Sequence, residues 1–189
     1  MKKLLLASVA MSLCAGSVLA EAHATEIKIG IIIGFTGPLE SITPNMAASA
    51  EIAVAEINAA GGIIDGMTVT TVRGDTTCGD AAIAVAATER LVTGEGISAI
   101  IGGDCSGVTT AMLQNVAMPN GIGMISPSAT SPALSTVEDN DLFFRTAPSD
   151  ARQGVVMTQV LMDRGITTVA LTYTNNDYGK GLAATKASA

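Results

Sequence analysis

Short apolar runs alternate along this chain with longer stretches in which apolar residues recur at helical spacing. The short runs are rich in β-branched residues and predict buried strands. The longer, alanine-rich stretches predict helices, and glycine or proline follows most of them. We expect strands at 27–35, 68–73, 98–102 and 122–125, and helices at 44–58, 80–92 and 108–118.

This order of elements predicts an α/β fold on a parallel sheet, because each helix carries the chain back across the sheet before the next strand begins. The crossovers should be right-handed. We therefore expect a doubly wound layer from the first strand to about position 125. Ligands of such sheets bind beyond the carboxyl ends of the strands.

The pattern changes after position 125. Residues 126–140 are rich in Ser, Thr and Pro and show no core periodicity. Beyond them we expect a short strand at 143–145, a helix at 150–164 that Asp150 caps, a buried strand at 168–172 and a helix at 178–189.

The segment 146–148, T-A-P, is interpreted as a crossing between two lobes. The chain then divides into an incomplete N-terminal α/β lobe at 25–146 and the start of a second α/β lobe at 147–189. One strand and two helices cannot bury a core, since a domain typically contains about 50 residues or more. We therefore expect a truncated chain that is poorly stable and binds ligand weakly or not at all.

The N-terminus has the pattern of a secretory signal peptide. Two lysines precede an apolar segment, 4–19, which ends in a small-x-small cleavage site at Ala20. The segment is too short for a membrane span, and the alternative is a buried N-terminal helix. We expect residues 1–20 to be removed, with cleavage possible as late as Ala24, and the protein to be periplasmic.

Export affects the cysteines, because disulfides persist in oxidising compartments. Cys14 would leave with the signal peptide, so Cys78 and Cys105 remain as a pair. A disulfide between them would close a loop that the chain-entropy model values at about 3.5 kcal/mol. The alternatives are two free thiols or a metal pair. The single histidine, His23, makes a metal site a poor prediction.

Two stretches, 99–110 and 123–134, each contain an expected strand and the hydroxyl-rich loop in which that strand ends. Hydroxyls and free backbone N–H groups suit a small polar ligand better than catalysis. The chain has no credible histidine base, no G-x-S-x-G motif, no phosphate-binding lysine motif and no G-x-G-x-x-G after the first strand. A formal charge of −7 argues against nucleic-acid or anionic-membrane binding. We expect neither an enzyme nor a cofactor.

A set of short motifs runs along the chain in order: I-K-I-G at 27–30, T-G-P at 36–38, E-I-N-A-A-G-G-I at 56–63, I-S-P-S-A-T-S-P at 125–132, F-R-T-A-P-S-D at 144–150, Q-G at 153–154 and N-D-Y-G-K-G at 176–181. With this set, the segment 27–186 resembles the branched-chain amino-acid (Leu/Ile/Val-binding-like) type of periplasmic substrate-binding protein, which serves bacterial ABC importers.

The resemblance implies a type I periplasmic-binding-protein fold, in which two α/β lobes close like a hinge on a ligand. It also implies a disulfide between Cys78 and Cys105, a membrane permease as partner and a monomer. Members of the family are about twice as long as this chain. Most of the second lobe, and the acidic residue that usually meets the ligand ammonium, would therefore lie outside it.

By position, the family's ligand hydroxyls fall on Ser106 and Thr130, and its main-chain contact falls on Ser128. The alternative for Ser106 is a plain helix N-cap, and for the other two an ordinary turn. Tyr178 falls where a second-lobe aromatic covers the ligand, and its alternative is a core aromatic at a helix start.

Two features depart from the family pattern. Asp104 stands where branched-chain binders carry an apolar pocket residue, and its alternative is a solvent-facing aspartate. The first loop, 39–46, lacks the usual small residues, and Glu40 and Ser41 could reach the cleft. The predicted ligand is therefore an amino acid or a related amide rather than leucine itself. The second functional hypothesis is a ligand-binding sensory module of a receptor or regulator on the same fold.

Overall fold

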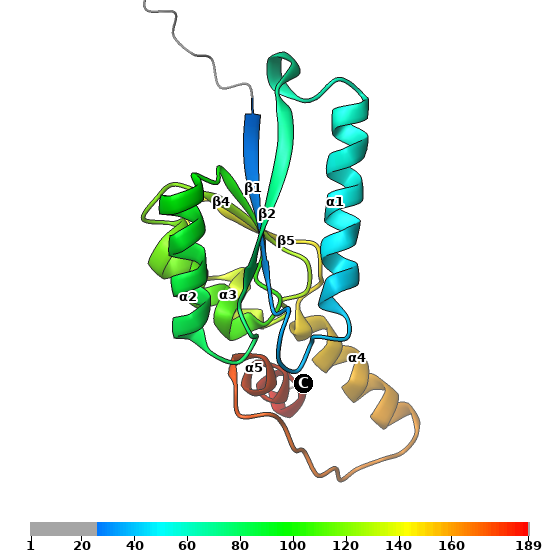
Figure 1. Ribbon diagram of the computed structural model, residues 1–189. Helices are drawn as coiled ribbons and strands as arrows, with labels where there is room; N and C mark the ends of the chain where they lie inside the picture. The colour runs from blue at the N-terminus through cyan, green and yellow to red at the C-terminus, as the bar shows by residue number, and fades with distance from the viewer. Residues whose placement is uncertain (1–25, 189) are drawn as a thin grey trace, which may run out of the picture.

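A computed structural model of the protein describes residues 26–188. The predicted signal peptide, Cys14 and His23 lie outside the described residues. Five strands form one parallel sheet in the order β2-β1-β3-β4-β5 (Figure 1). The strands are β1 (Glu26–Ile33), β2 (Thr68–Asp75), β3 (Ala99–Gly102), β4 (Gly123–Ser126) and β5 (Phe143–Arg145).

Helices cover both faces of this sheet: α1 lies on one face, and α2 and α3 lie on the other (Figure 1). Two further helices, α4 and α5, follow the sheet and pack against each other. The helices are α1 (Thr43–Ala59), α2 (Ala81–Arg90), α3 (Ser106–Met112), α4 (Asp150–Asp163) and α5 (Asp177–Ser188).

The central strand β1 explains this layering. Ile31 and Ile33 point to one face of the sheet and pack with Ala47 of α1. Ile32 points to the other face and joins the larger core cluster, which includes Leu91 and Met112. Successive side chains of a strand alternate between faces, so an uninterrupted apolar run indicates burial on both sides. The predicted doubly wound α/β layer is confirmed.

The predicted strands up to β5, and all the predicted helices, are present with boundaries shifted by a few residues. The helices expected at 80–92 and 108–118 each continue as a single π turn, at Leu91–Glu95 and Leu113–Ala117. Short 3₁₀ turns occupy Ile64–Gly66 and Pro132–Ser135. A π turn widens the helix by one residue per turn, and local periodicity does not predict it.

The strand expected at 168–172 is wrong. Residues 166–174 have no regular structure, and Val169 and Leu171 are exposed. The segment pairs with neither edge strand of the described sheet, and an extended segment without a ladder partner is not a stable strand. The predicted cap of α4 is also wrong: Ser149, not Asp150, accepts the helix N–H of Ala151, and Asp150 is the first helical residue.

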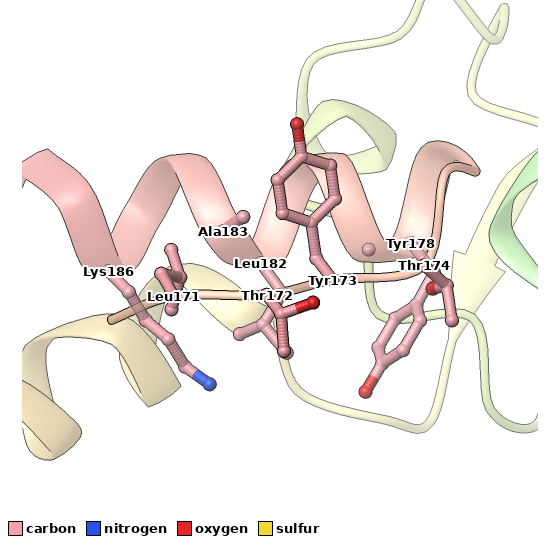
Figure 2. A pocket seen from close by; sticks show the side chains of 9 residues that line it. Leu171, Thr172, Tyr173, Thr174, Tyr178, Leu182, Ala183 and Lys186 are labelled. Carbon is pink, nitrogen blue, oxygen red and sulfur yellow. The ribbon is translucent and has the colours of Figure 1, made fainter. Parts of the chain in front are cut away.

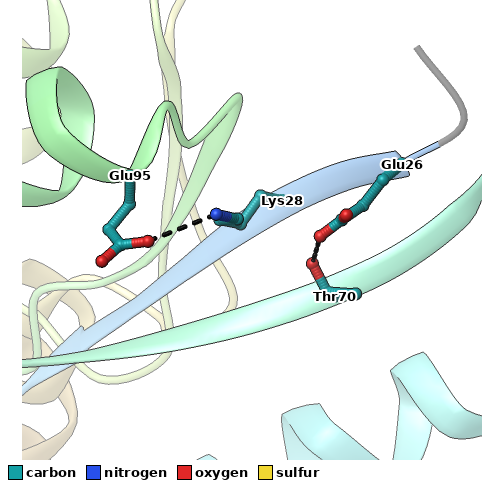
Figure 3. A network of polar contacts seen from close by, with 4 residues as sticks. All are labelled: Glu26, Lys28, Thr70 and Glu95. Carbon is teal, nitrogen blue, oxygen red and sulfur yellow. Dashed lines mark hydrogen bonds and ion pairs between the residues drawn. The ribbon is translucent and has the colours of Figure 1, made fainter.

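The amino end of the sheet carries surface polar contacts (Figure 3). Lys28 of β1 pairs with Glu95 at 3.2 Å, and the Thr70 hydroxyl of β2 donates to Glu26. These groups are exposed and lie at the edge opposite to the strand ends where ligands of this architecture bind. Among residues 26–188, no helix is long and apolar enough to cross a membrane.

Candidate functional site

The strand order places a topological switch point between β1 and β3. The chain first adds β2 on one side of β1, and then returns to add β3 on the other side. Crevices at such points are the usual ligand sites of open α/β sheets. One carboxylate joins the strand ends here. Asp104, after β3, accepts hydrogen bonds from the Gly34 backbone N–H, after β1, and from the Thr76 hydroxyl, after β2, each at 3.0 Å.

Asp104 is only 3% exposed, so the reading of it as a solvent-facing aspartate is wrong. Its carboxylate oxygens point to the neighbouring strand ends, where two donors satisfy them. The close approach requires glycine at position 34, because a Cβ there would lie 2.9 Å from the Asp104 Oδ2. The contact of Asp104 with a ligand stays a prediction.

The disulfide between Cys78 and Cys105 is confirmed, with a Cα–Cα distance of 5.4 Å. It joins the loop after β2 to the start of α3. The two sulfurs and the Asp104 carboxylate lie close enough together to hold a metal ion. Since both sulfurs are in the disulfide, this cluster offers no thiolate ligand.

Ser106 is the first residue of α3, and the alternative of Ser106 as its N-cap is wrong. The cap position is Cys105, whose side chain makes no capping bond. The buried Ser106 Oγ instead accepts a hydrogen bond from the Ser131 backbone N–H at 3.1 Å. The first hydroxyl-rich loop is thereby bonded to the second.

Two more serines form hydrogen bonds that connect the same two loops. The Ser128 hydroxyl donates to the Asp104 carbonyl oxygen at 2.8 Å. The Ser126 hydroxyl donates to the Gly103 carbonyl at 2.6 Å and accepts the backbone N–H of Ala129 at 2.9 Å. Residues 126–131, without regular structure for the most part, are therefore held by side-chain bonds to the end of β3.

Thr130 is bonded to Asp150, at the start of α4, in two directions. The Thr130 hydroxyl donates to the Asp150 carboxylate at 2.8 Å, and the Asp150 backbone N–H donates to the Thr130 carbonyl at 2.9 Å. Asp150 is 4% exposed. The sequence analysis assigned Asp150 only a capping role and missed this contact, although the motif F-R-T-A-P-S-D contains it.

Arg145 of β5 holds the residues on either side of Thr130. Its Nη1 donates to the Ala129 carbonyl at 3.2 Å and to the Ser131 carbonyl at 2.9 Å, and its Nη2 donates to Ser135. Burial lowers the pKa of the Arg145 guanidinium, and the charge of Asp150 opposes that change. Sequence reasoning did not single out this residue, because two of its three acceptors are backbone carbonyls, which any residue type supplies.

Tyr178 is the second residue of α5. It is 42% exposed and lines a hollow of about 430 Å³ between α5 and the preceding extended segment (Figure 2). Lys186, Tyr173 and Leu171 line the same hollow, whereas Ser106, Ser128 and Thr130 do not. Its ring is exposed within the described residues, and its contact with a ligand stays a prediction.

The loop after β1 is held by Asp75 at the end of β2. The Asp75 carboxylate accepts from the Thr36 hydroxyl at 2.6 Å and from the Thr77 backbone N–H at 2.8 Å. Burial raises the pKa of Asp75, but these hydrogen bonds together outweigh it and hold that pKa below its ordinary value. Glu40 and Ser41, further along the loop, are exposed.

The sequence model of a family described as "Periplasmic binding protein" matches residues 26–189. The chain belongs to this family. The family resemblance and the type I periplasmic-binding-protein fold that we inferred from the motifs are therefore confirmed. A Leu/Ile/Val-binding protein homolog 3 of Brucella melitensis is 36% identical over 180 residues, which are 95% of this chain and 47% of that protein.

Two further similarities bear on function. One solved structure is the substrate-binding protein of a branched-chain amino acid transporter from Streptococcus pneumoniae, in complex with isoleucine. It is similar to this chain with a TM-score of 0.76 and 34% identity, and the match covers 86% of this chain and 46% of the Streptococcus chain. A substrate-binding protein of a chemotactic signal transduction system from Halobacterium salinarum is 31% identical over 165 residues, 83% of this chain and 39% of that protein. The chain spans about half the length of the curated relatives it matches.

Proposed function

We propose that this chain is part of an extracytoplasmic solute-binding component of an ABC importer, and that it binds an amino acid or a related amide between two lobes. The first lobe is residues 25–146, and the second begins at 147. Closure on the ligand forms the surface that a membrane permease recognises. The membership of the family and the two amino-acid-binding relatives support this proposal.

The observation that carries the choice of ligand is the direction of two hydrogen bonds. A hydroxyl has one proton to donate and two lone pairs to accept with. The Ser106 oxygen already accepts from the Ser131 N–H, so its own proton is available to a ligand carboxylate. The Thr130 hydroxyl already donates its hydrogen bond to Asp150, so its oxygen is available to accept from a ligand ammonium. This pair suits a zwitterion.

The other predicted site residues enter the proposal with different roles. Ser128 contributes a main-chain contact, since its hydroxyl is engaged with the Asp104 carbonyl. Tyr178 covers the ligand from the second lobe with an exposed ring that suits a partly polar molecule. Asp104 borders the ligand in this proposal, and it also fixes the ends of β1, β2 and β3, the last of which leads into the loop of Ser106.

A sensory role on the same fold is the second candidate, and the similarity to the chemotactic substrate-binding protein favours it. The two functions share the binding step and differ in the membrane partner. Native mass spectrometry of the full natural protein, purified from its own periplasm, tests the binding step. A co-purified amino acid or amide supports the proposal. Conversion of such a molecule during incubation would contradict it and indicate an enzyme.

The membrane partner needs a separate measurement. Cross-linking of the ligand-loaded natural protein in intact cells should capture an ABC permease if import is the function. Capture of a chemotaxis transducer instead would replace import by the sensory role. Either result leaves the zwitterion site itself unchanged, so the two questions are decided independently.

A further inference from the structure

Asp150 is a buried carboxylate that no role in helix capping explains. Ser149 is the N-cap of α4, and Asp150 is the first residue inside the helix. Its carboxylate accepts a hydrogen bond from the Thr130 hydroxyl, and its backbone N–H donates to the carbonyl oxygen of the same residue. Two opposed bonds to one residue fix both the backbone and the hydroxyl orientation of Thr130.

Arg145 reinforces this arrangement from β5. Its guanidinium bonds the carbonyls immediately before and after Thr130, which prevents the backbone of 129–131 from rotating. It also lies close enough to Asp150 for the two charges to interact. The segment that carries Thr130 is therefore fixed by a cation on one side and a carboxylate on the other.

We propose that Asp150 is a positioning residue for ligand binding that acts through Thr130, an inference that rests on the proposed function. While the Thr130 hydroxyl donates to Asp150, it can only accept a hydrogen bond from a ligand. It therefore selects a ligand group that donates. The negative charge also polarises the hydroxyl and strengthens the bond it accepts. Asp150 thus favours ligands that carry an ammonium over carboxylic acids that lack one.

The test uses the full natural protein, freed of co-purified ligand, and titration calorimetry. The twenty standard amino acids are titrated into the wild type, and the tightest binder becomes the first probe. The second probe is the carboxylic acid with the same carbon skeleton and no amino group. The variants are Asp150→Asn, Thr130→Val and the two combined. Asp163→Asn, at the exposed end of the same helix, is the matched control.

Asp150→Asn should weaken binding of the amino acid about tenfold, because the neutral amide replaces a charged acceptor, and its NH2 group also lets the Thr130 hydroxyl turn and accept instead of donating. Binding of the acid without an amino group should change less than twofold, and Asp163→Asn should leave both unchanged. The double variant should bind no more weakly than Thr130→Val alone, because Asp150 acts through that hydroxyl. A loss of general structure would instead weaken both probes equally.

Three results would overturn the inference while leaving the proposed function standing: unchanged amino acid binding in Asp150→Asn, equal losses for the two probes, or additive effects of the two substitutions. Wild-type protein that binds none of the twenty amino acids would overturn both proposals. If Asp150→Asn does not fold, by circular dichroism, Asp150→Glu replaces it. Glutamate keeps the charge but displaces the carboxylate by one methylene, and the same selective loss is expected.

Discussion

The Asp104 carboxylate accepts the backbone N–H of Gly34 at 3.0 Å, although 70 residues separate the two along the chain. The bond joins the ends of β1 and β3 at the switch point of the sheet. The same carboxylate accepts the Thr76 hydroxyl from the end of β2. One buried side chain thus holds together the ends of β1, β2 and β3, and β3 leads into the first of the two hydroxyl-rich loops.

Substitution Asp104→Ala should destabilise the natural protein by about 2 kcal/mol, because it leaves two donors without their acceptor in a buried place. Asp104→Asn should cost less, since its amide oxygen can still accept from Gly34 while the Thr76 hydroxyl turns to accept. Urea unfolding measures both, with the exposed Glu138→Ala as control. Equal stability of Asp104→Ala and the wild type would contradict the role assigned to Asp104.

Reduction of the Cys78–Cys105 disulfide should lower the free energy of unfolding by about 3.5 kcal/mol, the entropy estimate for a closed loop of this length. Urea unfolding with and without dithiothreitol measures the difference. A variant with serine at both positions should show the same low stability and no response to the reductant. A reductant effect that persists in that variant would show that another group is responsible.

Substitution Ser106→Ala should weaken amino acid binding more than tenfold. It removes the proton offered to the ligand carboxylate and also leaves the Ser131 N–H without its acceptor. Calorimetric titration measures the affinity. Ser49→Ala, which removes an exposed hydroxyl of α1, should bind as the wild type does. Wild-type affinity in Ser106→Ala would remove this residue from the site.

Stability should fall in acid partly through Asp75. Its folded-state pKa lies below the ordinary value of 3.8, so its contribution is complete above that value and is lost as the pH falls through the folded-state pKa. Asp75→Asn should make the decrease in unfolding free energy below about pH 4 shallower. Urea unfolding at several pH values measures it, and an unchanged acid slope in Asp75→Asn would contradict the prediction.

The exposed pair Glu51–Arg73 provides a comparison. The hydrogen bond from Arg73 lowers the pKa of Glu51, against a smaller opposing effect of burial. Because the pair lies in solvent, Glu51→Gln should change the acid slope less than Asp75→Asn does, and salt should reduce the change further. A larger effect than that of Asp75→Asn would reverse the order of the two groups.

The sequence predicted the layered fold because its signals are local. The buried run at 31–33 and the periodic helices around it determine the alternation of strand and helix regardless of distant partners. The strand expected at 168–172 failed for the opposite reason: Val169 and Leu171 have strand-forming side chains, but a strand also needs a neighbour to pair with.

The place of the candidate hydroxyls at the strand ends followed from the sequence, but their hydrogen-bond partners did not. Hydroxyl-rich loops after β3 and β4 indicated where a ligand would lie. The bonds from Ser131 to Ser106 and from Thr130 to Asp150 depend on strand register and on how α4 leaves the sheet. Neither follows from residue types, so the donor and acceptor roles of the two hydroxyls emerged only from the structure.

In our proposal these two hydroxyls, one free to donate and one free to accept, belong to an amino acid site. Calorimetric titration of the full natural protein with the twenty standard amino acids tests it most directly. At least one of them should bind with a micromolar dissociation constant, and Thr130→Val should weaken that binding more than tenfold. Failure of all twenty to bind below the millimolar range would contradict it.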